Sequence, residues 1–182
     1  MAIAIFDWDD TLCPTHWMYT NGLFAYHVPT HEQWNALQQH GASLKNLLTR
    51  AHETCERVYI LTNSMHKWVY TTVERFFPAC AAILEHIEIC HAWKDIHIEV
   101  EQWKTMYLND HLRHLQDATN ILCFGDRDND TNTMIAFFQG KNAKILQLQE
   151  APSALVCTKQ LEHIYALWDK LYTTNKSTIT YL

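Results

Sequence analysis

The stretch Ile3-Ala4-Ile5-Phe6-Asp7-Trp8-Asp9-Asp10-Thr11 joins an apolar run to a group of carboxylates near the start of the 182-residue chain. Four apolar residues in a row are typical of a strand that is buried on both faces of a parallel sheet. The three carboxylates that follow repel one another unless a cation lies among them. Carboxylate oxygens suit Mg²⁺ better than zinc or copper. The stretch therefore predicts a buried strand that ends at a magnesium site, of the kind that assists phosphoryl transfer.

Short apolar runs and helical patterns alternate along the rest of the chain, which is typical of an α/β fold. We expect a three-layer α/β/α, doubly wound, Rossmann-like parallel sheet. The predicted strands are Ala2–Phe6, Arg57–Leu61, Ile83–Ile89, Asn120–Phe124 and Ala143–Leu148. The predicted helices are Glu32–Gln39, Ser43–Cys55, Lys67–Phe76, Val100–Leu115, Thr131–Gln139 and Ser153–Tyr172. Residues 173–182 fit either a polar tail or a last edge strand, and the sequence leaves both open.

Length and composition favour a single domain, 1–182, in which residues 14–56 could form a small helical lid. The formal charge of −6 excludes strong binding of nucleic acid by charge alone, so nucleic acid is expected only as a substrate. The six cysteines form no CxxC pair and lie mostly beside apolar residues, which predicts a reducing, cytoplasmic location. We expect no membrane partner, because neither a leader-like segment nor an apolar run of membrane-spanning length occurs.

Polar side chains follow three of the predicted strands at the point where each strand ends. Asp7 and Asp9 follow the first strand, Thr62-Asn63-Ser64 the second, and Gly125-Asp126-Arg127-Asp128-Asn129-Asp130 the fourth. Open parallel sheets bind ligands beyond the carboxyl ends of their strands. Lys104, before the fourth strand, adds a cation. Together these residues offer a nucleophile, an acid/base, hydroxyl and amide donors, and metal ligands.

At these positions the chain resembles the haloacid dehalogenase superfamily of phosphotransferases. Its first motif, DxDx[T/V], matches Asp7-Trp8-Asp9-Asp10-Thr11, and its second, an apolar strand ending in Thr or Ser, matches Val58-Tyr59-Ile60-Leu61-Thr62. Its fourth motif, GDxxxD, matches the run from Gly125 to Asp130. The runs Lys67-Trp68-Val69 and Trp103-Lys104 also resemble an uncharacterised plant and protist branch of the superfamily. The resemblance covers about residues 1–150.

The resemblance implies a phosphatase that works through an aspartyl-phosphate. Asp7 would attack phosphorus, while Asp9 would protonate the leaving oxygen and then activate water. Lys104 is preferred over Lys94 as the lysine of the third motif. An acid where Asp9 stands is shared by the phosphatases and mutases of this superfamily, whereas its ion pumps carry threonine there.

The resemblance also implies Mg²⁺ as the cofactor and a phosphorylated substrate, either a small molecule or a macromolecule. The implied metal ligands are Asp7, the backbone carbonyl of Asp9, Asp126 and Asp130, the last as a ligand or as a residue that orients one. The implied phosphate-binding residues are Thr62, Asn63 and Lys104. Ser64 and Cys13 are further candidates for substrate contact. Asp10 and Asp128 are better explained as turn or cap residues.

Substrate choice in this superfamily usually depends on an inserted cap, and here both places for a cap are short. We therefore expect a minimal lid, or none, and an open site. The aromatic residues of the segment 17–34 could stack on a base or sugar, but packing of helices onto the sheet explains them better; they include Trp17, Tyr19, Phe24 and Tyr26.

Two further interpretations come from other classes of protein. The first is a catalytically weak relative that binds a metal or a phosphorylated partner, although such a chain has no reason to keep Asp7, Asp9, Lys104 and Asp126 together. The second is a receiver domain of a response regulator. A receiver carries its phosphorylated aspartate at the end of the third strand, and Ile87-Glu88-Ile89-Cys90 has none. The enzyme is the preferred interpretation.

Overall fold

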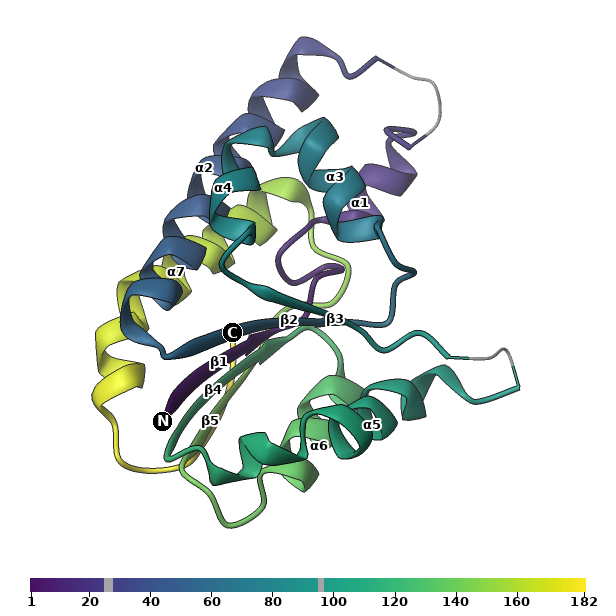
Figure 1. Cartoon of the computed structure of the whole chain (residues 1–182). Helices are drawn as coiled ribbons and strands as arrows, with labels where there is room; N and C mark the ends of the chain where they lie inside the picture. Colours follow the sequence, from purple (N-terminus) through teal and green to yellow (C-terminus); the bar gives the residue numbers. More distant parts are fainter. Residues whose placement is uncertain (25–27, 95–96) are drawn as a thin grey trace.

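The computed structural model describes residues 1–24, 28–94 and 97–182, and contains a six-stranded parallel sheet with helices on both faces (Figure 1). The strand order is β3-β2-β1-β4-β5-β6. The strands are β1 (Ala2–Phe6), β2 (Arg57–Thr62), β3 (Glu88–His91), β4 (Asn120–Gly125), β5 (Ala143–Gln147) and β6 (Thr178–Tyr181). This arrangement confirms the predicted three-layer, Rossmann-like α/β fold.

Two groups of helices cover the two faces of the sheet (Figure 1). One face carries α1 (Thr15–Thr20), α2 (His31–Thr54), α3 (Trp68–Phe76), α4 (Ala81–Leu84) and α7 (Ala154–Thr173). The other carries α5 (Val100–His111) and α6 (Asp128–Phe137). The short 3₁₀ helix η1 (Pro78–Cys80) precedes α4, and the 3₁₀ helix η2 (Arg113–Asp117) follows α5.

Strand β1 shows how the sequence fills both layers of the core. Ala4 and Phe6 belong to the hydrophobic cluster under α2 and α7, whereas Ile3 and Ile5 belong to the cluster under α5 and α6. Successive side chains of a strand point to opposite faces, so a continuous apolar run is needed where both faces are covered. The ring of Phe6 stacks on Phe124 with centroids 4.7 Å apart.

Two helices that the sequence predicts between residues 32 and 55 are one continuous helix, α2. Thr30 and Gln33 form a capping box at its start. The predicted break covers residues 40–42 and so includes Gly41, where a β-carbon would lie 3.3 Å from the Phe77 ring. Glycine thus lets the segment around Phe77 approach α2 closely, so this glycine serves packing and does not end the helix. The segment 14–56 consists of α1, α2 and their connection, and α2 packs along α7 over the sheet (Figure 1).

The predicted strand Ile83–Ile89 was wrong in its first half. Ile83 and Leu84 lie in the short helix α4, and only Glu88–His91 pair with β2. Ile83, Leu84 and Ile87 all reach the same hydrophobic cluster, which is a helical spacing of apolar residues. The predicted helix Val100–Leu115 ends at His111 and continues as the turn η2.

The last residues form an edge strand and not a free tail. Strand β6 pairs in parallel with β5, from Lys144 opposite Thr178 to Gln147 opposite Tyr181. All six cysteines are buried and free, as the sequence suggests. Across the described part of the chain, no helix has the length and apolar character needed to cross a membrane.

Strands β2, β1 and β4 are neighbours, and this order decides where the site lies. Their carboxyl ends bring Thr62, Asp7 and Gly125 to one edge of the sheet. The Asp7 amide donates to the Phe124 carbonyl at 2.8 Å, which holds the first carboxylate beside the end of β4. Residues more than 100 positions apart in the chain thus meet at the same edge.

Candidate functional site

Three buried aspartates form the centre of the site. Single carboxylate oxygens of Asp7, Asp126 and Asp130 all lie within 4.8 Å of one another. Asp7 follows β1, Asp126 follows β4, and Asp130 lies in the first turn of α6. Oxygen atoms at this spacing suit a hard divalent cation such as Mg²⁺. These three residues are called the acid triad below.

Gly125 makes the approach of Asp130 possible. A β-carbon on this glycine would lie 2.9 Å from the β-carbon of Asp130, closer than side chains pack. The glycine of the run Gly125–Asp130 is therefore needed for space, because α6 turns back over the end of β4 and brings Asp130 against it.

The electrostatics of the acid triad also fit a cation. Burial raises the pKa of Asp7 well above its usual value, with smaller increases from neighbouring aspartates and an opposing decrease from Lys104. Burial, followed by repulsion from Asp130, raises the pKa of Asp126 to about 7. Among the described residues, none donates a hydrogen bond to the buried Oδ2 of Asp126. A buried acceptor without a donor is costly, and a bound cation would remove that cost.

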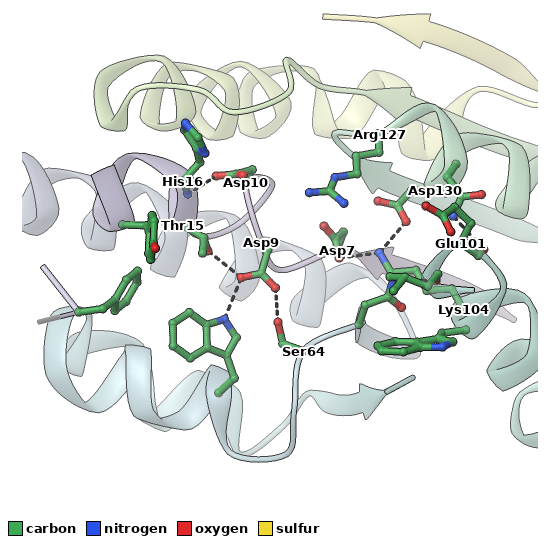
Figure 2. A pocket seen from close by; sticks show the side chains of 17 residues that line it. Asp7, Asp9, Asp10, Thr15, His16, Ser64, Glu101, Lys104, Arg127 and Asp130 are labelled. Carbon is green, nitrogen blue, oxygen red and sulfur yellow. Dashed lines mark hydrogen bonds and ion pairs between the residues drawn. The ribbon is translucent and has the colours of Figure 1, made fainter. Parts of the chain in front are cut away.

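Lys104 of α5 joins two members of the acid triad. Its Nζ lies 2.6 Å from Oδ1 of Asp7 and 2.7 Å from Oδ1 of Asp130, and its side chain is only 4% exposed (Figure 2). Burial by itself would lower the pKa of this amine, but the two carboxylates together raise it above its usual value. Lys94, the other candidate, lies 3.8 Å from Asp110. The geometry thus places Lys104 at the acid triad.

Asp9 accepts four hydrogen bonds, and Figure 2 shows its carboxylate directed toward Thr15 and Ser64 and not toward Asp7. Its Oδ1 accepts from Thr15 Oγ1 at 2.7 Å and from Trp68 Nε1 at 2.8 Å. Its Oδ2 accepts from Ser64 Oγ at 2.5 Å and from Thr62 Oγ1 at 3.3 Å. A carboxylate offers about four acceptor positions, so Asp9 is fully occupied. Its side chain therefore has a fixed orientation beside the acid triad without belonging to it.

The end of β2 contributes differently from what the sequence suggests. The Thr62 hydroxyl is fully buried, donates to Asp9 and accepts from the Ser64 amide at 3.0 Å. Asn63 lines the cavity and donates to the Val100 carbonyl at 3.4 Å. Of the two residues predicted to bind phosphate here, Asn63 lines the cavity and Thr62 positions Asp9.

Sequence reasoning missed the role of three residues that position Asp9: Thr15, Ser64 and Trp68. Ser64 follows β2 directly and was considered only as a substrate contact. Trp68 begins α3 and Thr15 begins α1, and neither has a spacing from Asp9 that marks it in the sequence. The only signal for Trp68 was its place in the run Lys67-Trp68-Val69.

Asp10 and Asp128 are structural, as the sequence indicates. Asp10 has a left-handed backbone with φ of 58° and accepts a hydrogen bond from the His16 amide at 2.8 Å, which secures the start of α1. Asp128 begins α6 on the surface and accepts from Gln147 Nε2 at 2.8 Å. Neither belongs to the acid triad.

A cavity of about 500 Å³ opens in front of these residues. Its described lining combines carboxylates, the cations Lys104 and Arg127, and the aromatic rings of Tyr19, Phe24, Trp68 and Trp103. Phe24 packs on Trp68, with ring centroids 4.9 Å apart, and Trp17 packs against the core. Tyr19 remains 73% exposed. Packing thus accounts for Trp17 and Phe24, and Tyr26 lies outside the described residues.

This arrangement can hold a divalent cation and an anionic group in front of the carboxylate of Asp7. A comparison of the chain with protein-family models, with curated proteins and with solved structures finds no match.

Proposed function

We propose that the protein is a Mg²⁺-dependent phosphomonoester hydrolase of the haloacid dehalogenase type, which acts through an aspartyl-phosphate on Asp7. One observation carries the proposal. Lys104 forms ion pairs with Asp7 and Asp130 at 2.6 and 2.7 Å beside Asp126, whose buried Oδ2 accepts no hydrogen bond from the described residues. A buried lysine between two carboxylates, next to a carboxylate oxygen without a donor that a cation could bind, suits the handling of a phosphate dianion.

In the first step a carboxylate oxygen of Asp7 attacks phosphorus. The bond from phosphorus to the leaving oxygen breaks, its electron pair stays on that oxygen, and Asp9 donates a proton to it. In the second step Asp9 takes a proton from water, whose oxygen attacks the same phosphorus and releases phosphate and the free carboxylate. Lys104 orients Asp7 and compensates its charge throughout, since it contacts Asp7 directly.

Mg²⁺ would be held by Asp7, Asp126 and Asp130, with the backbone carbonyl of Asp9 as a further ligand, and would supply positive charge next to the phosphoryl group. Three of its oxygen ligands would come from the acid triad. The raised pKa of Asp126, about 7, indicates a carboxyl that strongly favours a bound cation or a proton.

For this chemistry Asp9 must exchange at least one of its four hydrogen bonds for a contact with the substrate. All its acceptor positions are occupied by Thr15, Trp68, Ser64 and Thr62. The longest of these contacts, 3.3 Å from Thr62, is the easiest to give up. We infer that substrate binding and the release of an Asp9 contact occur together.

The test is the hydrolysis of 4-nitrophenyl phosphate by purified protein with Mg²⁺, with chelator, and with Asp7→Asn. We expect turnover that requires the metal and falls by at least about a thousandfold in the variant, because the nucleophile is lost. Asp128→Asn is the matched control, since Asp128 is an exposed aspartate in the same region and lies outside the acid triad. Turnover that persists in Asp7→Asn would refute the proposal, and binding of Mg²⁺ without any turnover would favour a metal-dependent binding module.

A further inference from the structure

The cavity carries more negative than positive charge, so a substrate phosphate needs a cation of the protein to balance its own charge. The described lining carries the five carboxylates of Asp7, Asp9, Asp10, Glu101 and Asp130. Its two permanent cations are Lys104 and Arg127. Even with Mg²⁺ bound, these five carboxylates outnumber the four positive charges of Mg²⁺, Lys104 and Arg127 together, so a phosphate dianion would enter a negative field unless cations of the protein face it.

Lys104 is already engaged by other groups. Its ammonium lies 2.6 and 2.7 Å from two carboxylates, and its side chain is only 4% exposed. An ammonium has three donors, so two of them are used before any substrate arrives. Lys104 therefore balances the acid triad first and leaves one donor for a phosphate oxygen.

Arg127 has the opposite character. It follows Asp126 directly, its side chain is 60% exposed, and Figure 2 shows it extending over Asp7 toward Asp10. Burial acts to lower the pKa of Arg127, but the nearby carboxylates, Asp126, Asp130 and Asp7 among them, outweigh burial and raise this pKa above its usual value. The guanidinium thus carries its charge above the reacting carboxylate.

The ion pairs of Arg127 are too long to hold it in place. Its Nε lies 3.9 Å from Asp126 Oδ2 and 3.8 Å from Glu150 Oε1, and Glu150 is 69% exposed. The pair with Glu150 is exposed on both sides and contributes little to stability, and the pair with the buried Asp126 carboxylate is too long for a hydrogen bond. A guanidinium has five donors in a planar fork that matches two oxygens of a phosphate. The side chain is therefore free to reorient toward an anion in the cavity.

We propose that Arg127 binds non-bridging oxygens of the phosphoryl group and is the second cation, after Lys104, by which this site holds its substrate. The inference rests on the proposed function, because it assigns a ligand contact within the same site. It makes Arg127 a residue that touches the substrate and not a surface partner of Asp126 or Glu150. The charge it supplies would count most in the transition state, where negative charge spreads over the phosphoryl oxygens.

The experiment measures the binding of inorganic phosphate by calorimetry at saturating Mg²⁺, for the wild type, Arg127→Gln, Arg127→Lys and Glu150→Gln. We expect Arg127→Gln to weaken phosphate binding about tenfold or more, because charged hydrogen bonds are lost. Arg127→Lys should be weakened less, since it keeps the charge but not the fork. Glu150→Gln, the matched control, should bind phosphate as tightly as the wild type or more tightly. In an aryl phosphate assay, Arg127→Gln should also raise KM.

Titration with Mg²⁺ alone separates this role from support of the metal site. Arg127→Gln should bind Mg²⁺ as tightly as the wild type or more tightly, since the change removes a positive charge near the acid triad and Arg127 donates no hydrogen bond to Asp126 Oδ2. Unchanged phosphate binding in Arg127→Gln, an equal loss of Mg²⁺ affinity, or no phosphate binding by the wild type would each overturn the inference. Phosphate binding that depends on Arg127, in a protein that hydrolyses no ester, would refute the proposed hydrolase and leave the inference standing.

Discussion

Because the His40 side chain is buried, we predict that the folded protein loses stability as the pH falls. The ring of His40 in α2 lies between two elements that flank the site, with Nε2 2.9 Å from the Leu12 carbonyl and Nδ1 3.1 Å from Thr158 Oγ1 in α7. A carbonyl only accepts, so Nε2 of the neutral ring carries the proton. Nδ1 can accept from the Thr158 hydroxyl only when that hydroxyl does not donate to the Ala154 carbonyl, which lies 2.7 Å away. His40 thus joins the loop after β1 to α2 and α7.

Burial lowers the pKa of His40 from 6.5 to about 4, and the hydrogen bond to Leu12 opposes this shift only in part. The unfolded chain therefore binds a proton at this residue between pH 6.5 and 4, while the folded protein does not. Stability is fully present above pH 6.5 and is lost as the pH falls toward 4. The full effect is about 3 kcal/mol, of which about 2 kcal/mol is lost between pH 7.5 and pH 5.

The measurement is urea unfolding, followed by tryptophan fluorescence without Mg²⁺, at several pH values for the wild type and His40→Gln. The measured quantity is the difference in unfolding free energy between the wild type and His40→Gln. This difference is needed because Asp126, whose pKa is raised to about 7, makes the folded protein more stable as the pH falls over part of the same range. We expect the stability advantage of the wild type over His40→Gln to shrink by about 2 kcal/mol from pH 7.5 to pH 5. His163→Gln, on the exposed face of α7, is the control. An advantage that stays constant within about 0.5 kcal/mol would refute this reasoning.

Two further predictions concern the site itself. Gly125→Ala should lower the free energy of unfolding by about 1–3 kcal/mol and weaken Mg²⁺ binding, because the new methyl group displaces Asp130. Gly140→Ala, at φ of +76° with nothing nearby, should lower stability without changing Mg²⁺ affinity, and equal Mg²⁺ affinities in both variants would contradict the argument. Trp68→Phe removes one donor from Asp9 and keeps an aromatic ring of smaller size. Turnover of an alkyl phosphate, which needs a proton on its leaving oxygen, should therefore fall about tenfold more than that of 4-nitrophenyl phosphate. An equal loss with both substrates would exclude a positioning role for the indole.

Local sequence was informative wherever a short stretch is sufficient to define an element. The apolar run before Asp7 predicted β1 because a strand covered on both faces is a continuous apolar run, and such a run can be recognised in the local sequence alone. Local sequence was misleading where contacts between residues distant in the chain determine the secondary structure. The helix runs through Gly41, and the glycine is there because Phe77 packs closely against it. Ile83 and Leu84 are helical because they reach the same hydrophobic cluster as Ile87.

The sequence by itself determined that this is a parallel α/β protein whose strands end in carboxylates, because apolar runs and the acids that follow them are local features. The tertiary structure decided that Lys104 and not Lys94 meets Asp7, a residue 97 positions away. It also decided that Asp9 accepts its hydrogen bonds from α1, α3 and the end of β2, and that Arg127 extends over the cavity (Figure 2). These relations depend on how the strands are ordered and how the helices return to them, and no spacing along the chain records that order.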